Sequence, residues 1–403
     1  MGLNIFMKTQ RFDFYRYKEQ IFTSRFVRYE SLRQWVKGLA IDGGILSSSV
    51  IGYSAEGREI YRLSIGTGSI PVLLWSQMHG DESTATLALA DVLNFLTSND
   101  VDKDFKAMLL KSCTFYFIPM LNPDGAERCQ RRNAQGIDIN RDFLALQSPE
   151  ARLLKKQQEL LNPGFAFNLH DQDSLWSVTG SRQPALISLL APPAEQSWNA
   201  TPSMRRAIQI LASLYTFLEE EIPGKIGRWK DEYEPRAVGE TFQKAGVATI
   251  LIESGGYHDE ASKQYVRKLN FDALLYAFSL IALGECQPEP ASMEIYQTIP
   301  FNTKEIFHII IRNCRLQTAG GLISVDVGLN HEPIDYNEHR RFVISDIGDL
   351  STFSAYKEID ALAAELDPAY LNLDARANFR IEAETENIII MEDGIHKEFN
   401  FEP

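Results

Sequence analysis

Four apolar segments of this 403-residue chain each stop at a residue that can bind a metal or move a proton. Apolar runs without alternation are typical of buried parallel strands, and open α/β sheets carry their chemistry just past the carboxyl ends of their strands. The segments and the residues that follow them are 71–78 with His79, 115–121 with Asn122, 165–169 with His170, and 247–252 with Glu253. The pattern predicts an α/β fold, with a mixed, mostly parallel sheet flanked by helices and a reactive edge.

The first of these endings, His79-Gly-Asp-Glu82, has the spacing of a metal site. At the start of a helix, residues three apart lie on one face, so His79 and Glu82 can reach one ion at about 2.0–2.2 Å. A catalytic zinc takes three protein ligands and keeps a fourth position open, and His170 is the obvious third ligand. The His79/Glu82 spacing alone also fits an ordinary helix start, because a glutamate there is stabilised by the helix dipole without a metal. His170 alone also fits a structural histidine.

The segment 122–143 is a long loop dense in turn-forming residues. It carries four arginines, namely Arg128, Arg131, Arg132 and Arg141. A solvated surface loop is the simplest interpretation. A loop of this length beside a metal edge is, however, well suited to holding an anion or a developing oxyanion with its guanidinium groups.

Taken together, these motifs resemble the zinc carboxypeptidases of the carboxypeptidase A type. The resemblance spans roughly residues 45–285, and 52–58 resembles the opening strand of that family. It rests on His79-x-x-Glu82, Asn122-Pro-Asp-Gly, Gly136-x-Asp-x-Asn-Arg141, His170 and Glu253. It implies that His79, Glu82 and His170 hold one Zn²⁺ ion.

The resemblance also implies roles for the remaining residues. Asp138 is expected to receive the second ring N–H of His79, and Glu253 to act as general base. The substrate-facing residues are Asn140 and Arg141 for the terminal carboxylate, and Arg131 for the scissile carbonyl, with Arg132 as the adjacent alternative. The family often has a mobile tyrosine before the base; Tyr233 is the nearest candidate here, although its register is off.

The implied function is a zinc metallopeptidase that hydrolyses a peptide bond at the C-terminal end of a peptide, using a zinc-activated water and a glutamate base. One alternative is a zinc amidohydrolase or deacylase that acts on cell-wall peptides or N-acyl amino acids. Another is a non-catalytic binding module that keeps the fold. The partner expected for the leading hypothesis is a peptide with a free C-terminal carboxylate.

Composition narrows the remaining partners and the compartment. The formal net charge of −14 argues against nucleic acid or an anionic membrane as the main partner, because both need basic surface. Cys113, Cys129, Cys286 and Cys314 show no paired spacing, and the N-terminus lacks the apolar core of a signal peptide. We therefore expect reduced thiols and a cytoplasmic location, while the oligomeric state stays open.

The chain is long enough for two domains. We expect a catalytic domain over 1–286, with an amphipathic helix over about 13–39 and another helix over about 204–220. Beyond a change of composition near Cys286, we expect a small β-rich accessory domain over 287–403. That domain should hold strands near 306–311, 322–329, 341–347, 379–384 and 387–391, and one helix near 356–366.

Overall fold

The computed structural model describes residues 11–39, 45–229, 232–257, 263–332, 341–367, 371–382 and 388–397. The chain divides into two compact units. The first comprises Met1–Ser174 and Gln183–Asn302, and the second Leu175–Arg182 and Thr303–Pro403. The division after Asn302, rather than after residue 286, arises because helix α11 (Pro290–Thr298) packs against helix α8 (Pro202–Glu219) of the first unit.

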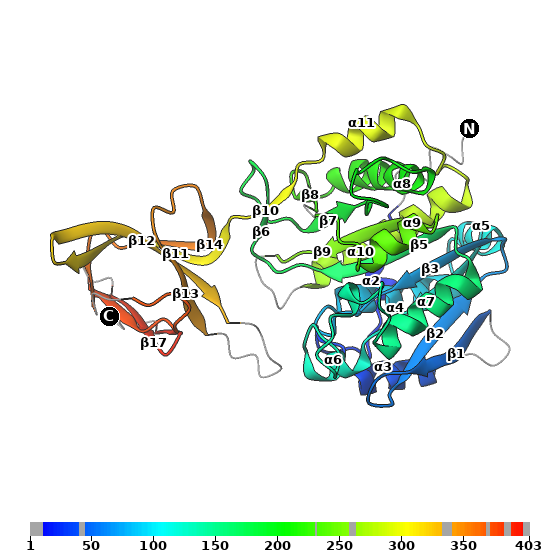
Figure 1. The fold of residues 1–403 in the computed structure, drawn as a ribbon, viewed down its shortest axis with the longest axis horizontal. Coiled ribbons are helices and arrows are strands. Elements are labelled where there is room, and N and C mark those ends of the chain that lie inside the picture. Colours follow the sequence, from blue (N-terminus) through cyan, green and yellow to red (C-terminus); the bar gives the residue numbers. More distant parts are fainter. Residues whose placement is uncertain are drawn as a thin grey trace. The chain divides into compact units, whose positions relative to one another are not determined.

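The first unit is built on an eight-stranded mixed sheet (Figure 1). Its order is β1-β2-β4-β3-β5-β9-β7-β8, and the central strands β4, β3, β5 and β9 are parallel. The bounds are β1 (Leu46–Tyr53), β2 (Glu59–Ile65), β3 (Ile70–Trp75), β4 (Cys113–Ile118), β5 (Phe165–Asp171), β7 (Ile187–Leu190), β8 (Ile226–Arg228) and β9 (Ala248–Ser254). The predicted α/β architecture is confirmed.

Helices cover both faces of this sheet, which is why its central strands read as unbroken apolar runs. In β3, Val72 and Leu74 join one buried cluster, while Leu73 and Trp75 join another. The first cluster includes residues of α4 (Thr84–Thr97), α5 (Lys103–Ser112), α8 and α10 (Lys263–Ala282). The second includes residues of α7 (Pro149–Leu161) and α9 (Val238–Lys244). The predicted helix near 204–220 is confirmed as α8.

The helix expected over 13–39 is two short helices, so this prediction is wrong in extent. They are α2 (Phe14–Tyr17) and α3 (Tyr29–Gly38), joined by an irregular segment. Tertiary hydrogen bonds fix that segment, since Asp91 accepts from the backbone N–H of Glu19 and Arg267 donates to the carbonyl of Glu19. Backbone groups bound to the core in this way are not available for a continuous helix.

The second unit is β-rich, as expected. Its larger sheet has the order β13-β12-β11-β15-β16-β17-β18, and β14 also pairs with β11. The bounds are β11 (Ile306–Thr318), β12 (Gly321–His331), β13 (Phe342–Gly348), β14 (Ser354–Asp360), β15 (Glu365–Asp367), β16 (Phe379–Glu382), β17 (Ile388–Glu392) and β18 (Ile395–Lys397). A small sheet pairs β6 (Trp176–Val178) with β10 (Asn302–Lys304). The five predicted strands lie in this unit, and residues 383, 384 and 387 of the last two lie outside the described residues.

The helix predicted near 356–366 is wrong. The segment forms β14 and β15, and β14 runs parallel to the long strand β11. Between them, Leu362 and Ala363 have φ values of 52° and 62°, which no right-handed helix accommodates. Pairing with β11 therefore overrides the helical propensity of this alanine- and leucine-rich segment. Among the described residues, no helix is long and apolar enough to cross a membrane.

Candidate metal centre and substrate-binding residues

The strand register of the first unit brings three of the predicted site residues to one edge. His170 near the end of β5 is the register partner of Glu253 near the end of β9. On the other side of β5, Trp75 pairs with Asn168, and the chain then continues from β3 to His79. His79, His170 and Glu253 are all buried. Parallel strands that end together thus deliver residues far apart in sequence to one place.

A tight turn, rather than a helix, carries His79 and Glu82. The backbone N–H of Glu82 donates to the carbonyl of His79, and α4 begins only at Thr84. The turn packs closely on α6 (Pro123–Arg128), because a Cβ on Gly80 would lie 1.9 Å from the backbone carbon of Gly125. We expected a helix start at this point, so the side chains meet for a different reason than the predicted one.

The Asn-Pro-Asp-Gly motif supports this turn. The side-chain oxygen of Asn122 accepts from the N–H of Gly125 and so caps α6. Its amide donates to the carbonyl of Met78, next to His79. Asp124 accepts from the hydroxyl of Ser54 and from Arg58, which ties the 52–58 motif to the same helix. The motif residues therefore hold the turn that carries His79 and Glu82 in place.

The three predicted ligands lie together. Nδ1 of His79 is 2.7 Å from one oxygen of Glu82, and Nδ1 of His170 is 2.8 Å from the other. One ligand atom from each residue lies within 4.8 Å of the other two, and this is the group of possible metal ligands found among the described residues. The two imidazoles thus present the same ring nitrogen toward one carboxylate.

Asp138 orients the first imidazole. Its carboxylate lies 3.2 Å from Nε2 of His79, and it accepts hydrogen bonds from Nε of Arg131 and from the N–H of Asn140. A histidine that gives its Nε2–H to a carboxylate keeps the lone pair of Nδ1 for a metal. Asp138 therefore lies where the sequence predicts it.

The charges of the group favour a cation at its centre. Burial opposes ionisation of Glu82, but the two histidines outweigh it and hold the pKa of Glu82 well below its usual range. Burial likewise lowers the pKa of His170. For His79, burial works in the same direction, yet Glu82 and Asp138 outweigh it and its pKa is raised. The group therefore holds a carboxylate that attracts positive charge.

This donor set fits zinc. Two neutral imidazoles and a carboxylate are ligands that zinc takes in hydrolases, and a cation would relieve the approach of two Nδ1 lone pairs to the oxygens of Glu82. Nε2 of His170 is buried and has no hydrogen-bond partner among the described residues. Nδ1, which lies 2.8 Å from Glu82, is the ring nitrogen of His170 that faces the other two predicted ligands.

Of the two neighbouring arginines, Arg131 reaches the metal ligands. Its Nη1 lies 3.1 Å from Nδ1 of His79 and 3.5 Å from Glu82, and its Nε donates to Asp138. Arg132 instead donates to the carbonyl of Gly136 within its own loop and is exposed. The side chain of Arg131 is 44% exposed, so it can also meet a substrate.

Asn140 and Arg141 lie on the short helix η1 (Ile139–Arg141) and contact the first residue of α9 and the segment before it. The side-chain oxygen of Asn140 accepts from the N–H of Val238, which leaves its NH₂ group for other partners. Nε of Arg141 lies 3.4 Å from Glu234, and the arginine side chain is 34% exposed.

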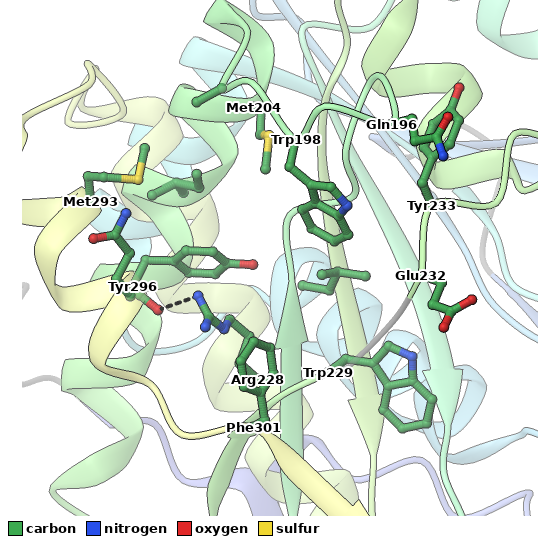
Figure 2. A pocket seen from close by; sticks show the side chains of 14 residues that line it. Gln196, Trp198, Met204, Arg228, Trp229, Glu232, Tyr233, Met293, Tyr296 and Phe301 are labelled. Atoms are coloured by element: carbon green, nitrogen blue, oxygen red, sulfur yellow. Dashed lines mark hydrogen bonds between the residues drawn. The ribbon is translucent and has the colours of Figure 1, made fainter.

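Tyr233, the neighbour of Glu234, lines a cavity together with Trp198 and Trp229 (Figure 2). Among the described residues, it makes no hydrogen bond to the metal ligands.

Two residues of this region were not predicted. Asp171 follows His170, donates its N–H to Glu82, and accepts from the hydroxyl of Thr84 at the start of α4. Its position beside His170 was the only available signal. Glu234 pairs with both Arg141 and Arg236. The three acidic residues and the arginine of 231–236 could have indicated an ion pair within the segment, but not the contact with Arg141.

Comparisons with known proteins agree with this geometry. Residues 32–209 match the family model of the zinc carboxypeptidases, a span that contains the three metal ligands, the arginine loop and Asp138 but ends before Glu253. Carboxypeptidase 2 of Trichophyton rubrum is 27% identical over 160 residues, which cover 37% of this chain and 29% of that protein. Carboxypeptidase D of Drosophila melanogaster is 31% identical over 112 residues, which cover 23% of this chain and 8% of that protein. The matched part is thus less than a third of these relatives.

Solved structures show the same fold. Carboxypeptidase A of Helicoverpa armigera superposes with a TM-score of 0.52 at 15% identity, over 64% of this chain and 74% of that one. A metallo-carboxypeptidase of Burkholderia cenocepacia gives a TM-score of 0.51 at 17% identity, over 64% and 68%. The family match over 32–209, with the ligand group inside it, identifies this part of the chain as a zinc carboxypeptidase domain.

Proposed function

We propose that this protein is a zinc-dependent carboxypeptidase that removes residues from the free C-terminal end of a peptide. The observation that carries the proposal is the group of His79, Glu82 and His170, in which both histidines are buried, with Glu253 paired in register beside His170. These four residues supply a three-ligand site for one ion and an adjacent carboxylate, which is the set that hydrolysis of an amide requires.

Zinc bound by His79, Glu82 and His170 would polarise the scissile carbonyl and lower the pKa of a water molecule. Glu253 would accept a proton from the attacking water and return it to the leaving amine. Its position at a strand end, 8% exposed, removes it from bulk water, which favours proton transfer to a positioned partner.

Arg131 and Arg141 would each bind a different negatively charged group of the substrate. Arg131, which already lies against His79 and Glu82, is the group best placed to stabilise an oxyanion at the scissile carbonyl. Arg141 would bind the terminal carboxylate, with the free NH₂ group of Asn140 as a second donor. A metallo-carboxypeptidase of Pseudomonas aeruginosa with a TM-score of 0.50 has been solved with (2-guanidinoethylmercapto)succinic acid, a ligand that carries carboxylates.

We assign this chemistry to the first unit and propose that the second unit is an accessory part. Arg132 and Tyr233 remain candidates for substrate contact from the loops that carry them. The four cysteines are free, which supports a reducing compartment such as the cytoplasm.

The test compares three substrates with the zinc-loaded protein. A peptide with a free C-terminus, the same peptide with a C-terminal amide, and an N-acyl amino acid are incubated in parallel, and released amino acids are quantified. We expect release from the first peptide and at least a hundredfold slower release from the amide, because the amide lacks the charge that Arg141 would bind. Turnover of the N-acyl amino acid alone would instead assign the protein to the deacylases.

A further inference from the structure

The first unit contains a cavity in whose lining only Tyr233 has been considered above for a role in substrate contact. This half-open cavity of about 700 Å³ lies where β7 and β8 end, between the start of α8 and α11 (Figure 2). Five aromatic side chains line it, namely Trp198, Trp229, Tyr233, Tyr296 and Phe301. Its volume falls in the usual range of small-molecule sites, which are mostly apolar with a few placed polar groups.

Arg228 is the cation in the wall of this cavity. Its guanidinium lies 4.1 Å from the ring centre of Phe301 and 5.3 Å from that of Tyr296. Nη1 donates to the carbonyl of Tyr296 at 3.4 Å, a long hydrogen bond, while Nε is buried and has no hydrogen-bond partner in the described part of the chain. Figure 2 shows the guanidinium held beside Tyr296 and Phe301.

Arg228 also has no ion-pair partner among the described residues. The fully buried Arg267, by contrast, is bound by both oxygens of Asp91. Buried polar groups are nearly always hydrogen-bonded, and a half-buried guanidinium without a carboxylate leaves a donor for an anionic ligand. The two rings fix the guanidinium in place, so little side-chain freedom would be lost on binding.

Trp198 gives the second, independent observation. Its backbone has a φ of 57°, a left-handed conformation that is unfavourable for a bulky residue, and its side chain is 39% exposed. Strain of this kind clusters at sites that hold ligands. Figure 2 shows the indole in the middle of the lining residues, where it can cover a bound molecule.

We propose that this cavity binds an aromatic carboxylate, with the carboxylate on the Nη groups of Arg228 and the ring among Trp198, Trp229 and Met204. An aromatic body suits walls made of indoles and a methionine. The lining holds one cation, Arg228, and one anion, Glu232, and the anionic group of the ligand would bind the arginine. The proposal goes beyond the peptidase function and does not depend on catalysis.

The test is calorimetric titration of the full-length, zinc-loaded protein with 3-phenylpropanoate and with its neutral amide. All titrations use the Arg141→Ala variant as background, so that a carboxylate bound by Arg141 does not contribute. We expect one molecule of the acid per chain and roughly ten- to hundredfold weaker binding of the amide, which loses the charge-assisted hydrogen bonds. Arg228→Gln should weaken binding of the acid by a similar factor, whereas Arg33→Gln on α3, a surface arginine, should leave it unchanged.

Three outcomes would overturn the proposal. These are no binding in the Arg141→Ala background, equal affinity for acid and amide, or unchanged affinity in Arg228→Gln. The acid-to-amide comparison decides the matter even if Arg228→Gln does not fold. A small aromatic acid and a peptide that ends in an aromatic residue both carry a ring and a carboxylate. To distinguish them, the affinity of acetyl-Phe is compared with that of acetyl-Ala-Ala-Phe. Equal affinity assigns the cavity to free acids, and tighter binding of the longer molecule assigns it to peptide ends.

Discussion

The metal-ligand group and the Arg141 segment differ in how they are held. His79 and His170 are buried, and both meet the carboxylate of Glu82 within 2.8 Å. The side chain of Arg141 is about one-third exposed, and its Nε lies 3.4 Å from Glu234, a residue far away in the sequence. A substrate carboxylate that binds Arg141 would have to replace Glu234. On the proposed function, the first region would hold one ion in a preformed group, while the second would exchange an internal carboxylate for that of the substrate. Variants of the two regions should therefore fail in different ways.

Glu253→Gln should give the largest change. Loss of the general base should lower kcat by about 10²–10⁴-fold, while zinc content stays at the wild-type level, because Glu253 is not among the three ligands. Steady-state kinetics and metal analysis on the same preparation check this expectation. A normal rate with normal zinc content would remove Glu253 from the mechanism.

Arg141→Ala should affect binding more than turnover. Without the guanidinium we expect KM to rise roughly tenfold to a hundredfold, with kcat changed far less and zinc retained. KM and kcat are measured with a peptide that has a free C-terminus. If KM stays unchanged, the terminal carboxylate binds elsewhere.

Gly80→Ala tests the close packing beneath the metal ligands. The added methyl would meet the backbone of Gly125, so we expect a loss of about 1–3 kcal/mol in the free energy of unfolding and weaker zinc binding. Gly38→Ala at the end of α3 has open space around it and should change stability by less than about 1 kcal/mol. Denaturant unfolding of both variants makes the comparison, and equal stability would show that the turn tolerates movement.

Glu234→Gln should give the smallest effect, in the opposite direction. A hydrogen bond from Arg236 lowers the pKa of Glu234 to about 2, so Glu234 is charged at neutral pH and would compete with a substrate carboxylate for Arg141. Its removal should lower KM by about two- to fivefold, the size expected for an exposed ion pair. Since a lowered pKa keeps the group ionised, the effect should be constant from about pH 5 to about pH 8. A raised KM would mean that Glu234 positions Arg141 instead of competing.

The difference between the metal-ligand group and the Arg141 segment also explains which features of the site could be predicted from the sequence. The strand endings at His79, His170 and Glu253 were readable because buried parallel strands leave continuous apolar runs, and strand ends meet at one edge. The turn that holds Glu82 was not, since it depends on contact between Gly80 and Gly125, 45 residues apart. The pairing of Arg141 with Glu234 and the conversion of 356–366 into strands also depend on distant partners. Local patterns carry no information about such contacts.

The most direct test of the account is the zinc content of purified His170→Ala beside the wild type, with His396→Ala in the second unit as a matched control. We expect one zinc per chain in the wild type and in His396→Ala, and a loss of most zinc in His170→Ala, because two ligands bind zinc far less tightly than three. Full zinc occupancy in His170→Ala, or none in a zinc-supplied wild type, would contradict a metal centre built from His79, Glu82 and His170.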